Sequence, residues 1–175
     1  PSNGTVTLNS ASAGTFTYSP AANYNGSDTF TFTVNDGSVT SSAATVTMTI
    51  TAVNDSPVAS NVTGTTVEDT DYSGTLSGSD VDGDDLTYAI ASNPSNGTVT
   101  LNSASAGTFT YSPTANYNGS DTFTFTVNDG TVTSSAATVT ITMTAVNDNP
   151  VASAVSGTTA EDTNYSGSFS GTDVD

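Results

Sequence analysis

Four carboxylates crowd into one short stretch of this 175-residue chain. The stretch is SDVDGDDL, residues 79–86, and it holds Asp80, Asp82, Asp84 and Asp85. The chain has no Lys, Arg or His, so no side chain can neutralise them. Two unit charges about 4 Å apart repel by roughly 1 kcal/mol in water and by about 4 kcal/mol at an effective dielectric near 20. Either the loop is splayed into solvent, or a metal ion binds there.

The overall charge excludes several classes of partner. Seventeen acidic and no basic residues give a formal charge of -17. Without basic side chains to contact phosphates, nucleic-acid binding is excluded. Repulsion also opposes docking on anionic membranes, and no apolar run is long enough to span one. We therefore expect no nucleic-acid partner and no membrane insertion.

The elements that must position these carboxylates are β-strands. Segments such as DTFTFTVNDG and AATVTMTIT alternate threonine with apolar residues, which is typical of a strand with one face buried. No helical period is present. We predict an all-β protein of tandem Greek-key β-sandwiches, with about seven strands in each repeat. In the complete repeat these strands fall near residues 58–66, 72–77, 86–90, 99–101, 109–111, 123–127 and 139–143.

The chain repeats itself with a period of 93 residues. The segment PSNGTVTLNSASAGTFTYSP begins at Pro1 and recurs unchanged at Pro94, and residues 1–82 differ from residues 94–175 at about 12 positions. The VNDSP and VNDNP segments read as linkers, because Pro ends strand pairing and Asn-Asp favours turns. We therefore predict the end of one repeat at 1–56, a complete repeat at 57–148 and the start of a third at 149–175.

Alternating strand directions sort the acidic residues between the two ends of each sandwich. At the trailing end of the complete repeat we expect Glu68, Asp69, Asp121, Asn147 and Asp148, facing Asp173 and Asp175 of the following repeat. At the preceding junction we expect Asp28, Asn54 and Asp55 opposite Asp80 and Asp82, with Asp84 in the same loop. Asp36 and Asp129 are second contributors at the leading ends.

Such sets of oxygen atoms favour calcium. Calcium takes six to eight oxygen ligands at about 2.3–2.6 Å, and oxygen ligands without His or Cys select hard cations. An EF-hand does not fit, because Gly83 comes too early and the twelfth loop position is Ala91. We predict calcium as the cofactor, bridging neighbouring repeats of the same chain. The competing interpretation is a solvated acidic turn.

Several motifs together resemble the cadherin family. VNDSP and VNDNP resemble the Asn-Asp-rich linker of cadherins, DVD resembles their D-x-D loop, and VEDT and AEDT resemble their glutamate near the first strand. The whole 93-residue unit is similar to the cadherin-like and Ig-like repeats of large bacterial surface adhesins. That resemblance implies a calcium-rigidified extracellular array in which the ligands include Glu68, Asp80, Asp82, Asn147, Asp148, Asp173 and Asp175, with Glu161 as the glutamate of the following repeat.

The expected function is therefore structural. We predict an extender segment of a secreted or surface-bound repetitive adhesin or filament, serving cell adhesion, biofilm or matrix. Catalysis is not expected, because a chain without His, Cys, Lys or Arg allows only a two-carboxylate glycosidase, and its acids lie in loops rather than around an aromatic cleft. The alternatives are a glycan-binding or partner-binding module, and a filament subunit that pairs through an uncharged edge strand at residues 137–146.

Overall fold

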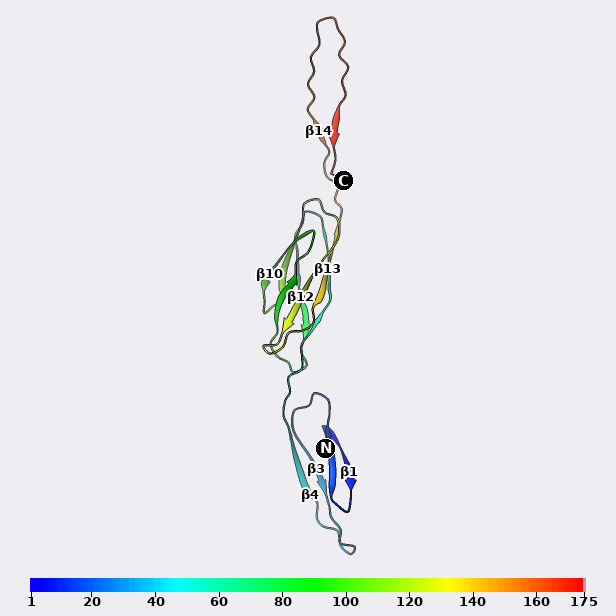
Figure 1. Cartoon of the computed structure of the whole chain (residues 1–175), viewed down its shortest axis with the longest axis vertical. Helices are drawn as coiled ribbons and strands as arrows, with labels where there is room; N and C mark the ends of the chain where they lie inside the picture. The colour runs from blue at the N-terminus through cyan, green and yellow to red at the C-terminus, as the bar shows by residue number, and fades with distance from the viewer. Residues whose placement is uncertain (175) are drawn as a thin grey trace. The chain divides into compact units, whose positions relative to one another are not determined.

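The computed structural model describes residues 1–174 and divides the chain into two compact units, Pro1–Asp55 (unit 1) and Ser56–Asp175 (unit 2) (Figure 1). The described residues form strands, turns and loops without a helix, which confirms the all-β prediction. Within unit 2, residues 57–148 are called the central repeat, and residues 149–174 are called the C-terminal segment.

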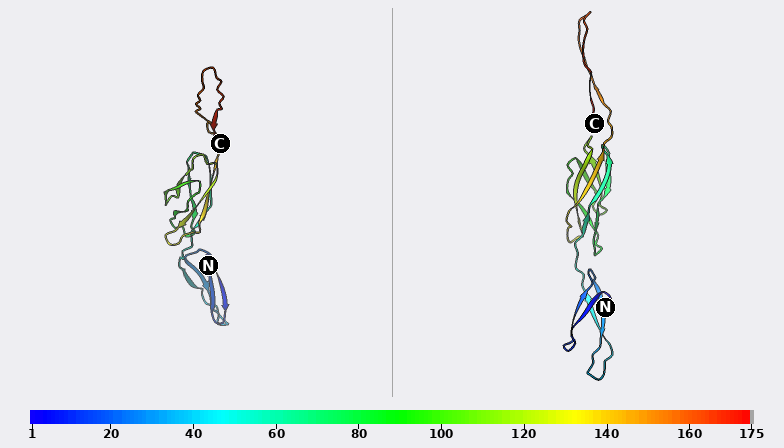
Figure 2. Two further views of the ribbon diagram at one scale, coloured as in Figure 1. Left: turned by 45° about the horizontal axis from the view of Figure 1, so that its top comes forward. Right: turned by 90° about the vertical axis from the view of Figure 1, so that its right-hand side faces the viewer.

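The central repeat consists of two main sheets and one short strand pair, whose strands lie side by side in Figures 1 and 2. The four-stranded sheet has the order β6 (Val62–Val67), β13 (Ala137–Thr144), β12 (Gly119–Asn128) and β9 (Thr87–Ser92). The three-stranded sheet has the order β10 (Gly97–Ser103), β11 (Thr108–Pro113) and β7 (Tyr72–Thr75). The short pair is β5 (Val58–Ser60) with β8 (Ser77–Ser79). Each predicted strand segment of this repeat therefore carries a strand.

The alternating sequence builds the core between these sheets. Along β12 and β13 the apolar residues are buried and the intervening threonines are half-buried or exposed, as a period of two requires. Phe109 of β11 meets Phe123 of β12 edge to face, with ring centroids 5.2 Å apart. Both side chains are essentially inaccessible to solvent. Such aromatic pairs stabilise a core beyond the area they bury.

One expectation about a strand edge is wrong. The segment 137–146 was expected to be an uncharged edge, but β13 lies inside its sheet between β12 and β6. The first strand of the repeat is divided: β5 pairs with β8, and β6 crosses over to pair in parallel with β13, with Val62 opposite Val139. The alternation of apolar and polar residues could not predict this parallel pairing, because a period of two shows which face of a strand is buried but not which strand lies beside it.

Unit 1 repeats only part of this architecture. Its strands β1 (Gly4–Ser10) and β2 (Thr15–Pro20) pair in the register of β10 and β11, including the same bulge. Strands β3 (Gly26–Phe32) and β4 (Ala44–Ile50) pair in the register of β12 and β13. The C-terminal segment contains the short pair β14 (Val151–Ser153) and β15 (Ser170–Thr172).

Candidate metal centres

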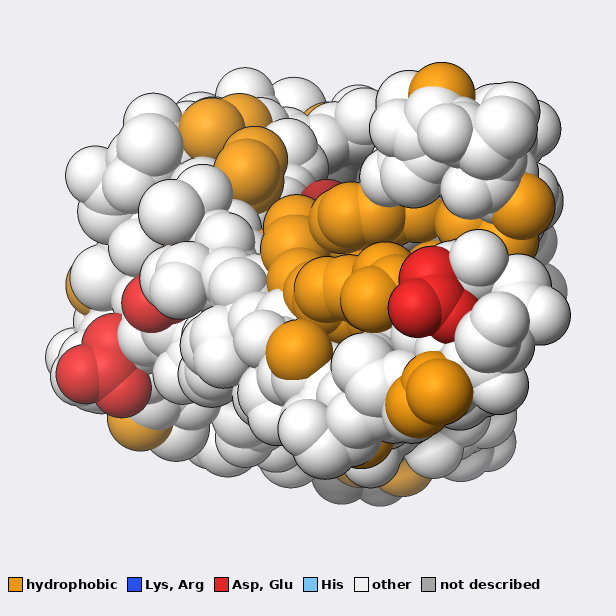
Figure 3. Space-filling model, turned by 90° about the horizontal axis from the view of Figure 1, so that it is seen from below, with side chains coloured by type: hydrophobic (Ala, Val, Ile, Leu, Met, Phe, Trp, Pro, Cys, Tyr) orange, Lys and Arg blue, Asp and Glu red, His pale blue; other side chains and the backbone are white. Residues whose placement is uncertain are grey.

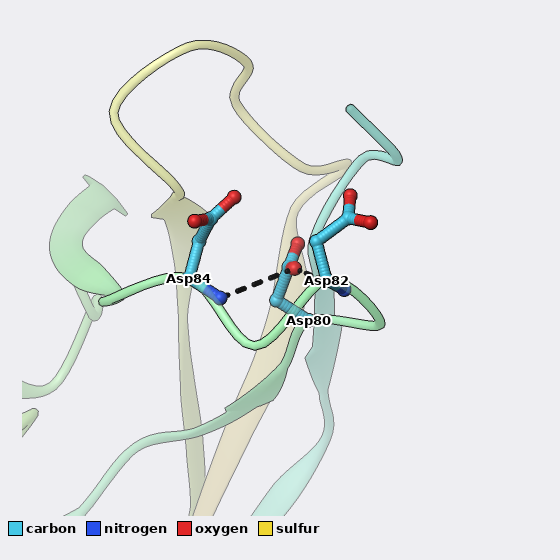
Figure 4. A group of neighbouring side chains, drawn as sticks. All are labelled: Asp80, Asp82 and Asp84. Carbon is cyan, nitrogen blue, oxygen red and sulfur yellow. Dashed lines mark hydrogen bonds between the residues drawn. The ribbon is translucent and has the colours of Figure 1, made fainter. Parts of the chain in front are cut away.

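The acidic loop at residues 79–86 is folded around one carboxylate. Asp80 Oδ1 accepts hydrogen bonds from the backbone N–H groups of Asp82 at 2.8 Å, Gly83 at 3.2 Å and Asp84 at 3.5 Å. Gly83 has φ of +82°, a conformation that glycine adopts without strain, and it turns the loop back. Asp80, Asp82 and Asp84 are therefore brought to one side of the loop (Figure 4).

The geometry of this loop suits a cation. One carboxylate oxygen from each of Asp80, Asp82 and Asp84 lies within 4.8 Å of the others. Calcium–oxygen bonds of about 2.4 Å can bridge that spread. Among the described residues this is the one group of three or more carboxylates drawn so close together. We call it the leading cluster.

The charges of the leading cluster are not balanced by the protein. Asp80 Oδ2 is buried and has no hydrogen-bond partner. An oxygen in that state is costly, because it loses its water without gaining a donor. Partial burial raises the pKa of Asp84, and the charges of Asp80, Asp82, Asp129 and Asp85 raise it further. A bound cation would relieve both the orphaned oxygen and the repulsion, so the donor set fits a hard metal ion.

Asp129 lies at the edge of the leading cluster, in the turn after β12. Its side chain is only 9% exposed, and its Oδ1 accepts hydrogen bonds from the backbone N–H groups of Thr131 and Val132, each at 2.6 Å. Its charge contributes to the raised pKa of Asp84. In unit 1 the equivalent Asp36 makes the corresponding hydrogen bonds at 2.8 Å. The prediction that Asp129 is a second contributor remains open.

A second set of oxygens lies beyond the other end of β12. Asp69, with φ of +57°, accepts a hydrogen bond at Oδ1 from the backbone N–H of Asn116 at 2.9 Å. With the Asn116 amide turned so that its nitrogen faces the carboxylates, it donates to Asp69 Oδ2 at 3.2 Å and to Asp148 Oδ2 at 3.3 Å. Turned the other way, the amide presents its oxygen there, and three oxygens converge. We call Asp69, Asn116 and Asp148 the trailing cluster.

Sequence reasoning missed Asn116. In the sequence, Asn116 stands in the segment ANYNG and resembles an ordinary turn residue. In the structure, Asn116 and its equivalent Asn23 both have φ of 58°. Asn tolerates this left-handed conformation better than most residues. Its proximity to Asp69 and Asp148 depends on three distant segments meeting, which no local pattern reveals.

Glu68 connects the trailing cluster to the linker. Its side chain is 3% exposed, and its Oε1 accepts a hydrogen bond from the backbone N–H of Val146. Its own backbone N–H donates to the carbonyl of Thr144 at 3.0 Å. In the linker, Asn147 Nδ2 donates to the carbonyl of Asp148 at 2.6 Å, as Asn54 does to Asp55 at 2.8 Å. Glu68, Asp69, Asn147 and Asp148 are thus grouped near the end of β13.

Asp121 has a structural role instead. It is 5% exposed, and its carboxylate accepts hydrogen bonds from the Tyr111 hydroxyl at 2.9 Å and from the backbone N–H groups of Asn96, Ser95 and Thr122 at 2.7, 3.1 and 2.9 Å. Burial alone would raise the pKa of Asp121, but these hydrogen bonds outweigh it and lower the pKa. Both oxygens are thus engaged inside the fold, although the predicted ligand role itself is untested.

Asp28 makes the same contacts in unit 1. It accepts hydrogen bonds from the Tyr18 hydroxyl at 2.9 Å and from the backbone N–H groups of Ser2, Asn3 and Thr29. These bonds outweigh the effect of burial and lower the pKa of Asp28 to about 2. Burial and the nearby Asp28 raise the pKa of Tyr18 to about 12. We call this arrangement of Asp with Tyr the carboxylate latch.

The remaining predicted ligands stay predictions. Asn54 and Asp55 belong to unit 1, whereas Asp80 and Asp82 belong to unit 2, so the expected junction between them is not tested. In the C-terminal segment, Glu161 and Asp173 are exposed, and Asp173 Oδ1 accepts a hydrogen bond from the backbone N–H of Val174 at 2.8 Å. Asp175 lies outside the described residues.

Comparisons with known proteins agree with the fold. The bacterial cadherin-like domain profile matches residues 1–52, and the bacterial Ig domain profile matches residues 54–142. No curated protein matches the chain. A human mucin-like protocadherin fragment, EC1-2, is similar in structure, with a TM-score of 0.52 and 18% identity over 83% of this chain and 86% of that one. At this identity the likeness shows the fold alone.

An endo-fucoidan hydrolase from glycoside hydrolase family 107 is a weaker structural match. Its TM-score is 0.46 and its identity 24%, over 86% of this chain. The match spans 24% of the length of that hydrolase, so it concerns a small part of the enzyme.

Bacterial Ig and cadherin-like domains are non-catalytic modules typical of extracellular surface proteins. None of the described residues forms a helix long and apolar enough to cross a membrane.

The bacterial Ig profile covers just over half of the chain, and the two main sheets of the central repeat, with their shared aromatic core, match its all-β character. The chain belongs to the bacterial Ig domain family.

Proposed function

We propose that this chain is an extender segment of a repetitive extracellular adhesin or filament, stiffened by calcium at the junctions between its repeats. The observation that carries the proposal is the presence of two oxygen-rich clusters on one module. The leading cluster, Asp80, Asp82 and Asp84, holds a buried oxygen without a donor. The trailing cluster places the Asn116 amide against two carboxylates.

The topology separates these clusters along the module. Asn116 precedes β12 by three positions, and Asp129, whose charge acts on Asp84, follows β12 directly. A ten-residue strand is about 33 Å long. The two clusters are therefore at opposite ends of one sandwich, where a following or preceding repeat would add further ligands. This arrangement suits a row of modules with one metal-bearing junction between each pair.

Charge supplies the driving force. The chain has 17 acidic side chains and no basic side chain, so neutralisation must come from external cations. Oxygen-only ligands select calcium or magnesium over zinc or copper, and calcium tolerates the irregular geometry of loop ligands better than magnesium does. Extracellular calcium modules bind in the range of about 10⁻⁴ to 10⁻³ M. The array would therefore be flexible at cytosolic calcium and stiff outside the cell.

The Asn116 amide gives the trailing cluster two states. Without a cation, its NH₂ group donates to Asp69 and Asp148 and offsets their repulsion. With a cation, a half-turn of the amide presents its oxygen as a ligand beside the two carboxylates. The same three side chains can therefore hold the linker end near Asp148 in either state. Glu68 keeps the linker close by accepting the hydrogen bond from Val146.

Small-angle X-ray scattering of a chain of several repeats, with millimolar calcium and then with chelator, tests the proposal. We expect a rod in calcium and a more flexible, more compact ensemble in chelator. The double variant Asp80→Asn, Asp82→Asn should lose this response, whereas Asp71→Asn, which removes an exposed charge outside both clusters, should keep it. A profile that calcium does not change would contradict the proposal.

A glycan-binding or partner-binding module is the alternative from a different class. Glycan-array binding by the same chain, without any calcium-dependent stiffening, would favour that alternative. The near identity of the repeats favours the extender, because reach grows with every added module while a single binding site needs only one.

A further inference from the structure

The central repeat contains two Asn-Gly pairs with the same local chemistry. They are Asn96-Gly97, at the start of β10, and Asn118-Gly119, at the start of β12. In such a pair the backbone nitrogen of the glycine can attack the side-chain carbonyl carbon of the asparagine, because glycine has no side chain to obstruct the approach. Both pairs are therefore chemically capable of a spontaneous change of the asparagine side chain.

This change, deamidation, needs only water. A bond forms between the glycine nitrogen and the asparagine Cγ, the Cγ–Nδ2 bond breaks, and ammonia leaves with the proton that the glycine nitrogen loses. Water then opens the cyclic imide to an aspartate, or to an isoaspartate whose backbone runs through the former side chain. No oxidant or reductant takes part. The rate depends on how easily the two reacting atoms reach each other, so a rigidly held pair reacts slowly.

The structure holds the Asn96-Gly97 pair on several sides. The backbone N–H of Asn96 donates to Asp121 Oδ2 at 2.7 Å. The Asn96 carbonyl accepts hydrogen bonds from the backbone N–H of Thr114 at 2.8 Å and from the Tyr111 hydroxyl at 3.2 Å. Asn96 is half-buried, and a Cβ at Gly97 would lie 2.6 Å from the Tyr111 hydroxyl oxygen. The carboxylate latch therefore restrains this pair.

The Asn118-Gly119 pair is held less firmly. Both residues are exposed, and Gly119 has φ of +125°. The nearest atom to a Cβ at Gly119 would be the Tyr117 hydroxyl oxygen, at 3.3 Å. That hydroxyl donates to the carbonyl of Ser120 at 3.0 Å, so it spans the pair without bonding to it. An exposed turn of this kind opens locally at little cost, which lets the reacting atoms approach each other.

Unit 1 shows the same contrast. The backbone N–H of Asn3 donates to Asp28 Oδ2 at 2.9 Å, and its carbonyl accepts a hydrogen bond from the Tyr18 hydroxyl at 3.3 Å. Asn25 is exposed, and the following Gly26 has φ of +124°. Asn25 is followed in the chain by the complete central repeat, and it is exposed as Asn118 is. Each copy therefore has one restrained and one exposed Asn-Gly pair.

We propose that Asn118 is a site of spontaneous deamidation, and that the carboxylate latch protects Asn96 from the same reaction. Asn25 and Asn3 have the corresponding roles in unit 1. The reaction does not involve calcium, so this proposal stands independently of the proposed function. The exposed pairs would record the age of the protein, while the latched pairs stay intact.

The product changes the charge and the backbone at the start of β12. Each event replaces a neutral amide with a carboxylate, two positions after Asn116 of the trailing cluster. No basic side chain exists in the chain to neutralise it, and Figure 3 shows acidic side chains without a basic one on the face drawn. An isoaspartate would also add one backbone atom directly before Gly119, where the ladder to β13 begins opposite Met143.

Tandem mass spectrometry of the intact chain, sampled during storage in chelator at mildly alkaline pH, locates the reaction. We expect Asn118 and Asn25 to deamidate at least about tenfold faster than Asn96 and Asn3, a difference of about 1.4 kcal/mol in barrier. In denaturant all four should react at similar rates, because the latch and the turn are lost. Asn118→Gln should abolish the event at that position and leave Asn25 unchanged. Equal rates at Asn118 and Asn96 in the folded chain, or an Asn118 that stays intact while the denatured chain reacts, would overturn the proposal.

Tyr111→Phe tests the protective role of the latch. It removes the hydroxyl that bonds to the Asn96 carbonyl and to Asp121, yet it keeps the buried ring. We expect faster deamidation at Asn96 and an unchanged rate at Asn118. Asp121→Asn, which weakens the bond to the Asn96 N–H, should act in the same direction. The matched control Tyr117→Phe should leave Asn96 protected. If neither latch variant speeds the reaction at Asn96, the latch does not protect it.

Discussion

Unit 1 has nearly the same sequence as residues 94–148 of the central repeat, but its apolar side chains are buried differently. Phe125 and Val127 are inaccessible to solvent, whereas Phe32 is 48% exposed and Val34 is 63% exposed. The carboxylate latch behaves differently, because Asp28 and Asp121 are both 5% exposed. The latch therefore needs only neighbouring segments that both copies contain, namely β11, β12 and the residues before β10 in the central repeat. The hydrophobic core also needs residues of β5 to β9. The same sequence therefore forms the latch in both copies, but it does not by itself bury the core side chains.

The difference has a physical reason. The latch joins a carboxylate to donors no more than 26 residues away, all present in both copies. The core lies between two sheets. If one sheet is incomplete, the inner face of the other sheet stays exposed to solvent. Strand pairing and strand register are the same in unit 1 and in residues 94–148, whereas the apolar side chains of unit 1 are more exposed. Local hydrogen bonds set the pairing of neighbouring strands, and the hydrophobic effect holds the two sheets of a repeat together.

The largest expected effect is a loss of stability when a core phenylalanine of the central repeat is truncated, compared with the equivalent phenylalanine of unit 1. Phe109→Ala should lower the free energy of unfolding of the central repeat by about 3–5 kcal/mol, because it leaves a cavity against Phe123. Phe16→Ala should lower the free energy of unfolding of unit 1 by less than about 1 kcal/mol, because Phe16 is already 41% exposed. Urea unfolding followed by tyrosine fluorescence measures both. Equal effects would mean that the two copies are buried alike.

The latch should contribute in both copies. Asp121→Ala removes the buried acceptor of the Tyr111 hydroxyl and of three backbone N–H groups, which should cost about 3 kcal/mol. Asp28→Ala should expose the Ser2 and Asn3 amides to faster hydrogen exchange in unit 1 while leaving the central repeat unchanged. The exposed Asp71→Ala is the control. If the Asp28 variant leaves exchange in unit 1 unaltered, the latch is not a local device.

The latch and the leading cluster should respond to pH with opposite signs. The pKa of Asp121 is lowered on folding, so its contribution is present above its unfolded pKa of about 3.9 and is lost as the pH falls through the folded pKa. The pKa of Asp84 is raised, so its ionised form opposes folding at neutral pH, and protonation relieves the repulsion.

In chelator, the free energy of unfolding should therefore rise slightly as the pH falls from 7 toward about 5 and then fall below about 4. Denaturant titrations at several pH values measure it. Asp84→Asn should remove the rise, and Asp121→Asn should reduce the fall. A curve that Asp84→Asn leaves unchanged would contradict the assignment of repulsion to the leading cluster.

A smaller effect on calcium binding should distinguish the Asn116 side-chain amide from its equivalent, Asn23, in unit 1. Asn116→Ala should weaken calcium binding about tenfold, or about 1.4 kcal/mol, because it removes one oxygen of the trailing cluster. Asn23→Ala, at the same backbone conformation in unit 1, is the matched control. Calorimetric titration with calcium compares the two. Equal loss in both variants would point to a backbone effect and not to a ligand.

Strand positions were readable from the sequence because period-two patterning is local. The Thr-Phe and Thr-Val alternation places β12 and β13 where they are observed. The neighbours of each strand were not readable, so the central position of β13 was missed. The acidic loop at 79–86 was readable, since its residues are adjacent in the chain. Asn116 was not, because it meets Asp69 across 47 residues.

Asp121 shows a third case. An acidic residue at the start of a strand near predicted ligands reads as another ligand, and only the Tyr111 hydroxyl and the N–H groups of Ser95 and Asn96 reveal the latch. A tyrosine ten residues before an aspartate is no recognisable motif on its own. Its recurrence as Tyr18 and Asp28 follows from the duplication and adds no independent signal.

The most direct test of calcium at both ends of the central repeat is a ¹H–¹⁵N correlation spectrum of the full chain titrated with calcium. The account predicts saturable shifts at the amides of residues 80–84 and of Asp69, Asn116 and Asp148, with the amides of the two latches, Asn3 and Asn96, unmoved. Shifts confined to the latches, or no saturable shift at either cluster at millimolar calcium, would contradict it.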